Sequence, residues 1–172
     1  MKGTNQKVIG IIPARMGSSR FPGKPLTKIS GFPMIGHIYL RSLISKKIDS
    51  LYVATCDDEI KEYCESIGAE VLMTNNQHTR ALDRVAEAAT QIVNGEDNPI
   101  ILNIQGDEPL ICPQVIEELI DEFENNTIKS ALLATPIKSK KIFENPDTVK
   151  LVISESGYMA YSSRASIPVS YT

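Results

Sequence analysis

The stretch "KVIGIIPARMGSSRFPGKPL", residues 7–26, joins a short apolar run to a loop rich in glycine and positive charge. The run is rich in Val and Ile, which is typical of a strand buried on both faces of a parallel sheet. In the loop, glycines let backbone N–H groups approach an anion, and Arg15, Arg20 and Lys24 add positive charge. The stretch therefore predicts a phosphate site after a buried strand. The competing interpretation is a solvated turn, broken by Gly and Pro and kept soluble by its charges.

Two known nucleotide-binding motifs do not match this loop. In a Walker loop, GxxxxGK[ST], the glycines are one residue closer together than Gly17 and Gly23, and Lys24 is here followed by Pro25. No GxGxxG follows the first strand, which argues against a dinucleotide-binding oxidoreductase. The loop predicts a phosphate site of another kind.

Three further apolar runs predict strands, and helical patterns lie between them. Alternating strand and helix indicates an α/β fold with a mainly parallel sheet and helices on both faces. We expect a single domain over residues 1–172. The strand runs are residues 50–55, 69–73 and 99–105, and the helical patterns are residues 33–43, 57–68 and 80–93.

Local signals mark the ends of these elements. Pro33 suits the first turn of a helix, Asp57 and Asp58 are predicted to cap the next helix, and Gly68 is predicted to end it. The later runs 129–137, 148–154 and 157–170 predict further strands, the last two antiparallel. The apolar face predicted for the third helix consists of Leu82, Val85, Ala86, Ala89 and Ile92.

Composition excludes several classes of protein. A formal net charge of −3 and a pI near 5.5 give no general attraction to nucleic acid or to an anionic membrane. No run approaches the roughly 20 apolar residues that span a bilayer, so we expect a cytoplasmic protein with neither nucleic acid nor membrane as a partner. The cysteines, Cys56, Cys64 and Cys112, lack CxxC spacing, and His37 and His78 lie far apart. This pattern predicts buried free thiols and argues against a disulfide framework or a zinc site.

A second loop, "QGDEPL" at residues 105–110, follows the strand predicted over residues 99–105. In open α/β sheets, ligands bind outside the carboxyl ends of the strands, so both loops are expected at one crevice. Asp107 could hold Mg²⁺, which usually takes one or two carboxylates together with water and substrate phosphates. Gln105 could hydrogen-bond a hydroxyl-rich substrate. A tight turn with Asp107 as a helix cap is the competing interpretation.

Five motifs, taken in their order and spacing, carry a family resemblance over nearly the whole chain. The chain closely resembles the CMP-Kdo synthetases, or 3-deoxy-manno-octulosonate cytidylyltransferases. The resemblance implies a Rossmann-like nucleotide-diphospho-sugar-transferase fold. It also implies use of CTP, with Mg²⁺, to activate Kdo or a related acidic sugar for lipopolysaccharide or surface glycan. The motifs are "IIPARMGSSRFPGKPL", "GFPMIGHI", "VATCDDEI", "LNIQGDEPLI" and "YSSRASIP".

The resemblance also implies residue roles. The sugar's anomeric hydroxyl would attack the α-phosphorus of CTP and pyrophosphate would leave in line, so alignment and charge neutralisation carry the rate. Arg15, Lys24 and Asp107 would form the catalytic group, and Asp107 would be the metal ligand. A planar guanidinium suits Arg164 to pair with the sugar carboxylate, and a structural ion pair is its competing interpretation. The implied nucleotide-binding residues are Ala14, Arg15, Arg20, Lys24 and Arg84, and the implied sugar-binding residues are Gln105 and Arg164.

Two departures from the family pattern limit the transfer of function. Where the family usually has the sequence Ser-Gly-Thr, this chain has Arg80, Ala81 and Leu82. The replacement favours an earlier start of the helix and changes a contact to the base, the ribose or the sugar. The chain ends at Thr172, so we expect it to lack a C-terminal part that brings a second metal-binding aspartate and much of the contact of a homodimer. The alternatives are a nucleotidyltransferase for a different sugar or nucleotide, and a nucleotide-binding remnant without turnover.

Overall fold

A computed structural model of the chain describes residues 6–17, 21–95, 98–124 and 127–168. The chain divides into two compact units, Met1–Ala131 and Leu132–Thr172, and each unit is described by itself. A single domain over residues 1–172 stays a prediction.

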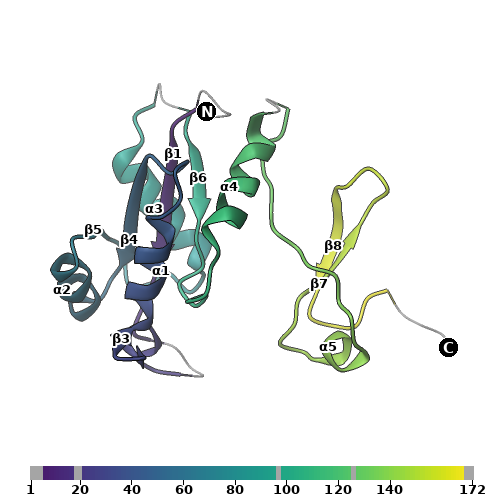
Figure 1. Ribbon diagram of the computed structural model, residues 1–172, viewed down its shortest axis with the longest axis horizontal. Helices are drawn as coiled ribbons and strands as arrows, with labels where there is room; N and C mark the ends of the chain where they lie inside the picture. Colours follow the sequence, from purple (N-terminus) through teal and green to yellow (C-terminus); the bar gives the residue numbers. More distant parts are fainter. Residues whose placement is uncertain (1–5, 18–20, 96–97, 125–126, 169–172) are drawn as a thin grey trace. The chain divides into compact units, whose positions relative to one another are not determined.

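The first unit is built on a parallel sheet of four strands (Figure 1). Its strands are β1 (Val8–Pro13), β4 (Ser50–Thr55), β5 (Glu70–Met73) and β6 (Ile100–Asn103), in the spatial order β5-β4-β1-β6. All three pairings are parallel. The strands predicted from the apolar runs are thereby confirmed. The chain forms β1 first, then β4 beside it and β5 at the edge, and it then crosses to the other side of β1 to form β6. The strand order therefore reverses between β1 and β6.

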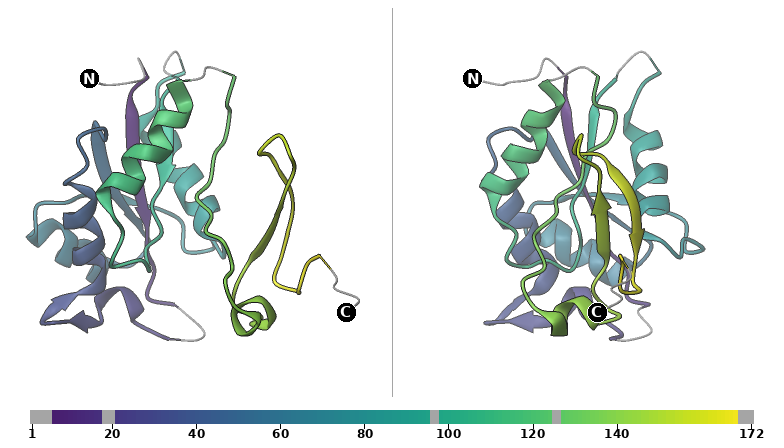
Figure 2. Two further views of the ribbon diagram at one scale, coloured as in Figure 1. Left: turned by 45° about the vertical axis from the view of Figure 1, so that its right-hand side comes forward. Right: turned by 90° about the vertical axis from the view of Figure 1, so that its right-hand side faces the viewer.

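Helices cover both faces of this sheet (Figures 1 and 2). Because a strand-helix-strand crossover is right-handed, α1 and α2 lie on one face, and α3, on the return path to β6, lies on the other. Successive side chains of β1 point to opposite faces of the sheet. Val8 and Ile12 pack with α1, α2 and α4 on one face, and Ile9 and Ile11 pack with α3 on the other. The helices are α1 (Met34–Ser42), α2 (Asp58–Ser66), α3 (Ala81–Ile92) and α4 (Pro113–Asp121), with short 3₁₀ turns η1 (Lys24–Leu26) and η2 (Glu122–Glu124).

The buried face of α3 differs from the predicted one. Val85 is buried, as predicted, but Leu82 is 64% exposed and Ala86 is exposed as well. The buried face is rotated toward Arg84, which is 2% exposed. A buried guanidinium is tolerated because it is hydrogen-bonded, here to Thr74 and to Cys56. A helix face predicted from apolar residues alone could not include it.

The helix-capping prediction for Asp57 is also wrong for its side chain. Asp57 occupies the N-cap position of α2, but its side chain makes no capping hydrogen bond. Instead its Oδ2 accepts from the backbone N–H of Met16 at 2.8 Å, which ties the loop after β1 to the end of β4. Gly68 ends this helix at a positive φ of 80°, as predicted. Pro33 lies at the N-cap of α1, one residue before the helix begins.

The second unit contains α5 (Lys140–Glu144) and an antiparallel pair, β7 (Lys150–Ile153) and β8 (Met159–Ser163). The antiparallel end of the chain is thereby confirmed. The strand predicted over residues 129–137 is wrong, because no strand is formed there and its apolar side chains Leu132 and Leu133 are exposed. Antiparallel β2 (Lys28–Ile29) and β3 (Phe32–Pro33) form a small hairpin in the first unit.

The three cysteines are free, as predicted, but only Cys64 is buried. Burial raises the pKa of its thiol to about 12. Cys56 is half-buried and Cys112 is exposed. Within the described part of the chain, no helix has the length and apolarity needed to cross a membrane.

Candidate functional site

The two loops singled out in the sequence meet where the strand order reverses. The loop after β1 carries Lys24, and the loop after β6 carries Asp107. Lys24 Nζ lies 2.9 Å from Asp107 Oδ2, with the two side chains 35% and 54% exposed. A cation and a carboxylate thus face each other at the reversal point, which is where open α/β sheets bind ligands.

Gly106 brings the second loop against the end of β1. A Cβ atom added at Gly106 would lie 2.2 Å from the carbonyl oxygen of Pro13, so any other residue would force the backbone apart. The strand itself continues its pairing through Ala14, which is 7% exposed and donates its N–H to the Ala54 carbonyl at 2.9 Å. The glycine of "QGDEPL" is therefore required by close packing, and it places Asp107 within reach of Lys24.

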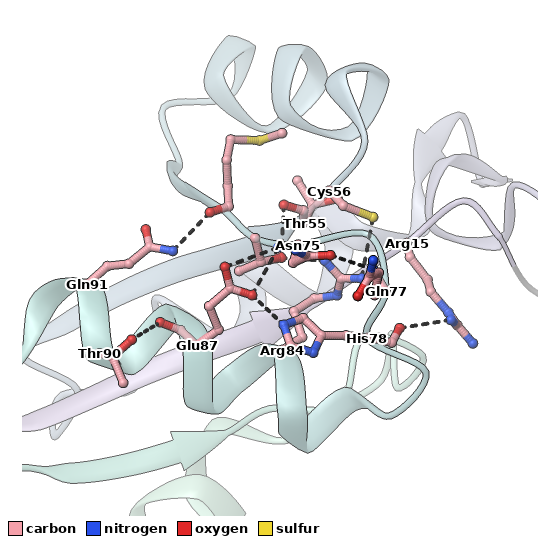
Figure 3. Close-up of polar contacts among 12 residues, drawn as sticks. Arg15, Thr55, Cys56, Asn75, Gln77, His78, Arg84, Glu87, Thr90 and Gln91 are labelled. Carbon is pink, nitrogen blue, oxygen red and sulfur yellow. Dashed lines mark hydrogen bonds and ion pairs between the residues drawn. The ribbon is translucent and has the colours of Figure 1, made fainter.

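The loop after β5, residues 74–80, also contributes to this edge of the sheet (Figure 3). Thr74 anchors its start, because its backbone N–H donates to the Thr55 carbonyl at 2.8 Å. Further along, the carbonyl of His78 accepts from Nη1 of Arg15 at 3.1 Å. Arg15 is an exposed residue, and Figure 3 shows its side chain reaching the His78 backbone from the neighbouring loop.

Glu87, on α3, holds the same loop through contacts with its carboxylate. Its carboxylate accepts from the backbone N–H of Asn75, at 2.9 Å for Oε2 and 3.1 Å for Oε1. It also contacts Nε2 of His78. The hydrogen bond from Asn75, followed by the one from His78, lowers the pKa of the Glu87 carboxyl. An ionised carboxylate only accepts, so the His78 ring carries its proton on Nε2 and donates it.

The remaining predicted site residues are placed differently from one another. Arg84 is buried, with its guanidinium bound to protein groups as described above. Gln105 is exposed just after β6. Arg164 belongs to the second unit, where its Nη1 donates to the carbonyls of Asp147 at 3.0 Å and Pro146 at 3.3 Å. Arg20 lies outside the described residues.

The loops offer a metal ion few ligands from the protein. Among the described residues, no three His, Cys, Asp or Glu side chains cluster as a metal site. Among the described residues, the carboxylate that pairs with Lys24 is that of Asp107, and it is more than half exposed. Mg²⁺ commonly takes one or two carboxylates and completes its octahedron with water and substrate phosphates, so a single carboxylate here fits that ion.

Sequence reasoning missed several residues that build this edge. Asp57, Thr74 and Glu87 fix the loops, and none was assigned such a role. Thr74 follows directly after β5 and Asp57 lies two residues after the end of β4, so the rule that pointed to Asp107 would have found them too. Glu87 lies in the second turn of α3, and no sequence signal marks it.

The geometry is that of an α/β protein with a basic loop and a carboxylate at the switch point, where such sheets bind their ligands, and the family match places it among the nucleotidyltransferases. The family model described as "Cytidylyltransferase" matches residues 9–172. The chain belongs to the cytidylyltransferase family. The expected α/β fold and the resemblance to CMP-Kdo synthetases are confirmed.

Curated relatives agree with this placement. The chain is 43% identical over 164 residues to the 3-deoxy-manno-octulosonate cytidylyltransferase of Thermodesulfovibrio yellowstonii, a match covering 93% of the chain and 64% of the relative. It is 45% identical over 160 residues to the 8-amino-3,8-dideoxy-manno-octulosonate cytidylyltransferase of Shewanella woodyi, a match covering 92% and 65%. The chain thus spans less than two thirds of the length of these relatives.

A solved structure is similar as well. It is that of CMP:2-keto-3-deoxy-manno-octonic acid synthetase complexed with CTP, to which the chain is 35% identical, with a TM-score of 0.82. The match covers 95% of this chain and 66% of that one.

Proposed function

We propose that this chain carries the nucleotide-binding part of an enzyme that transfers CMP from CTP to Kdo or its 8-amino derivative and releases pyrophosphate. The observation that carries the proposal is the Lys24–Asp107 pair at the strand-order reversal, 2.9 Å apart, in a chain of the cytidylyltransferase family. The relatives named above act on these two sugars by their names, and the similar solved structure holds CTP.

The charged residues of the two loops have different roles in binding the nucleotide. Lys24 and Arg15 bind the triphosphate and oppose the negative charge that develops on the leaving pyrophosphate. Asp107 would hold Mg²⁺, and the bound ion would supply neutralisation of phosphate charge.

Each unit carries one residue to which the family resemblance assigns a role in sugar binding. Gln105 offers an amide to a sugar hydroxyl, and Arg164 offers a planar guanidinium to the sugar carboxylate. The exposed segment Arg80–Leu82, at the start of α3, tunes the choice of base or sugar. Pairing of two copies as a homodimer is a further prediction, which sedimentation analysis of the purified chain tests.

The test is pyrophosphate release from CTP and Mg²⁺, with Kdo in one series and 8-amino-Kdo in another, alongside calorimetric binding of CTP. Release with either sugar supports the proposal, and the faster series names the sugar. Asp107→Asn should abolish the magnesium dependence of release, so an unchanged magnesium titration contradicts the role given to Asp107. Absence of both binding and release overturns the proposal.

A second candidate is nucleotide binding without turnover. It is favoured by the division of the chain, because Arg15, Lys24 and Asp107 all lie in the first unit and Arg164 lies in the second. The same experiment separates the two, since this candidate gives CTP binding with no pyrophosphate release.

A further inference from the structure

Arg15 is a long, exposed side chain that must be oriented if it is to meet a phosphate. An exposed arginine loses rotamer entropy when it is held in one conformation. Within the part of the chain that the structure describes, the His78 carbonyl is the backbone oxygen that accepts from its guanidinium, at 3.1 Å. The position of that oxygen therefore decides where the guanidinium lies before any ligand arrives.

The position of the His78 carbonyl depends on the path of residues 74–78. Thr74 is bonded to the end of β4 by its N–H and its Oγ1, at 2.8 and 3.2 Å from the Thr55 carbonyl. Past this anchor the loop is exposed at Asn75 and Gln77. Asn75 Oδ1 accepts from the Gln77 N–H at 2.8 Å, which tightens the turn but does not attach it to the rest of the unit.

Glu87 supplies that attachment from the rigid face of α3. One carboxylate receives the Asn75 N–H at the start of the turn and the His78 ring at its end. These two contacts hold both ends of the turn, so the Glu87 carboxylate fixes the distance between the turn and α3. Figure 3 shows the sequence of contacts from Glu87 through His78 to Arg15.

We propose that Glu87 is a positioning residue: by clamping the 74–78 turn it places the His78 carbonyl so that Arg15 is preorganised for a triphosphate. The inference deepens the proposed function and rests on it for the identity of the ligand. Glu87 itself touches neither substrate nor metal. Preorganisation raises affinity by reducing the entropy lost on binding, so the effect belongs to binding of the triphosphate.

The first experiment compares Glu87→Gln with wild type by calorimetric titration of CTP and CMP. Glu62→Gln, which removes an exposed carboxylate from α2, is the control for net charge. We expect Glu87→Gln to raise the Kd for CTP by roughly 3- to 10-fold, since Arg15 keeps its charge and loses only its preorganisation. The Kd for CMP and the behaviour of Glu62→Gln should stay as in wild type.

A double-mutant cycle separates positioning from a general structural effect. If Glu87 acts through Arg15, Glu87→Gln should change the Kd for CTP by less than about twofold in an Arg15→Ala background. A loss of equal size in both backgrounds overturns the proposal. If Glu87→Gln does not fold, His78→Ala decides instead, because it removes the ring contact and keeps the backbone carbonyl.

A ligand-free measurement keeps this inference distinct from the proposed function. The ¹⁵N order parameter of the Arg15 Nε–H, measured in the protein alone, should fall in Glu87→Gln and stay unchanged in Glu62→Gln. An unchanged value in Glu87→Gln overturns the positioning role. If wild type binds no CTP yet the order parameter falls as expected, the proposed function fails and the positioning role stands.

Discussion

Lys24 and Asp107 are the residues on which the nucleotide proposal depends, and their exposure decides how they can be tested. Their ion pair is 2.9 Å long but has side chains 35% and 54% exposed. Exposed ion pairs contribute about 0–1 kcal/mol to folding, so removing this one should leave the fold intact. A change in ligand binding can then be assigned to the site.

Lys24→Ala should weaken binding of CTP much more than binding of CMP, because the proposed function assigns its ammonium to the triphosphate and CMP lacks the β- and γ-phosphates. The loss of a charge-assisted hydrogen bond predicts a drop in CTP affinity of about 10-fold to 100-fold. Calorimetry with both nucleotides measures it. Equal losses for CTP and CMP would indicate a folding defect and contradict the role given to Lys24.

Gly106 should tolerate no side chain. Its added Cβ would lie 2.2 Å from the Pro13 carbonyl oxygen, and a backbone atom cannot turn aside as a flexible side chain can. Gly106→Ala should therefore destabilise the first unit by about 1–3 kcal/mol, as overpacking does. Thermal unfolding measures the loss. Gly17→Ala is the matched control, since its added Cβ meets nothing within 4 Å, and a similar loss in both variants would contradict this account.

At the scale of elements, the second unit is organised around one buried ammonium. Lys150, on β7, is 1% exposed. Its three N–H bonds go to the carbonyls of Arg164 at 2.6 Å, Asn145 at 2.7 Å and Thr148 at 3.0 Å. These carbonyls lie before β7 and after β8, so the ammonium joins the segments that flank the hairpin. A buried charge is stable in such a place only because all its donors are satisfied.

Lys150→Met should loosen the β7–β8 hairpin. It keeps most of the aliphatic stem but removes one donor from each of the three carbonyls, and of these the Asn145 carbonyl still accepts from the Thr148 N–H. Each carbonyl that stays buried without another donor costs about 1–3 kcal/mol. Hydrogen exchange should show lost protection in the hairpin and unchanged protection in the sheet of the first unit. The exposed Lys138→Met serves as control, and equal exchange in both variants would show that the ammonium does not hold the hairpin.

The contacts of the Glu87 carboxylate with the 74–78 turn should contribute less to stability at acid pH. The pKa of Glu87 is lowered from its ordinary value of 4.5, first by the Asn75 N–H and then by His78. A lowered pKa in the folded state means that the stabilisation is complete above pH 4.5 and is lost as the pH falls through the folded value.

Chemical denaturation at several pH values checks this sign. The stability advantage of wild type over Glu87→Gln should be constant at neutral pH and should shrink below pH 4.5. An advantage that grows on acidification would contradict the assigned carboxylate contacts.

At the scale of the whole molecule, the apolar core formed by the described residues lies in the first unit. Both clusters of buried hydrophobic residues, with the side chains packed against them, fall between Val8 and Phe123. The chain 1–131 should therefore fold alone, unfold cooperatively and bind CTP with the affinity of the full chain. Circular dichroism and calorimetry test this. A fragment that fails to fold would contradict the independence of the first unit. A folded fragment that binds CTP much more weakly than the full chain would contradict the assignment of the nucleotide site to the first unit.

Much of this fold and part of its site could be predicted because the signals are local. Runs of Val and Ile predicted all four parallel strands, and the order of strand and helix predicted that the loops after β1 and β6 share one edge. That rule was enough to bring Lys24 and Asp107 to the same crevice before their 2.9 Å contact was known. The segment 129–137 shows the limit, because an apolar run forms a strand only where a partner strand pairs with its backbone.

By itself, the sequence determined the elements, the parallel sheet, the edge that carries the site and the family. Only the tertiary structure decided that Asp57 binds the Met16 N–H, 41 residues away, instead of capping its own helix. It likewise decided that Arg84 turns into the protein and that Glu87 clamps the loop that holds Arg15. The physical reason is that apolar periodicity is written along the chain, whereas the partner of a polar side chain depends on which distant groups the fold places beside it.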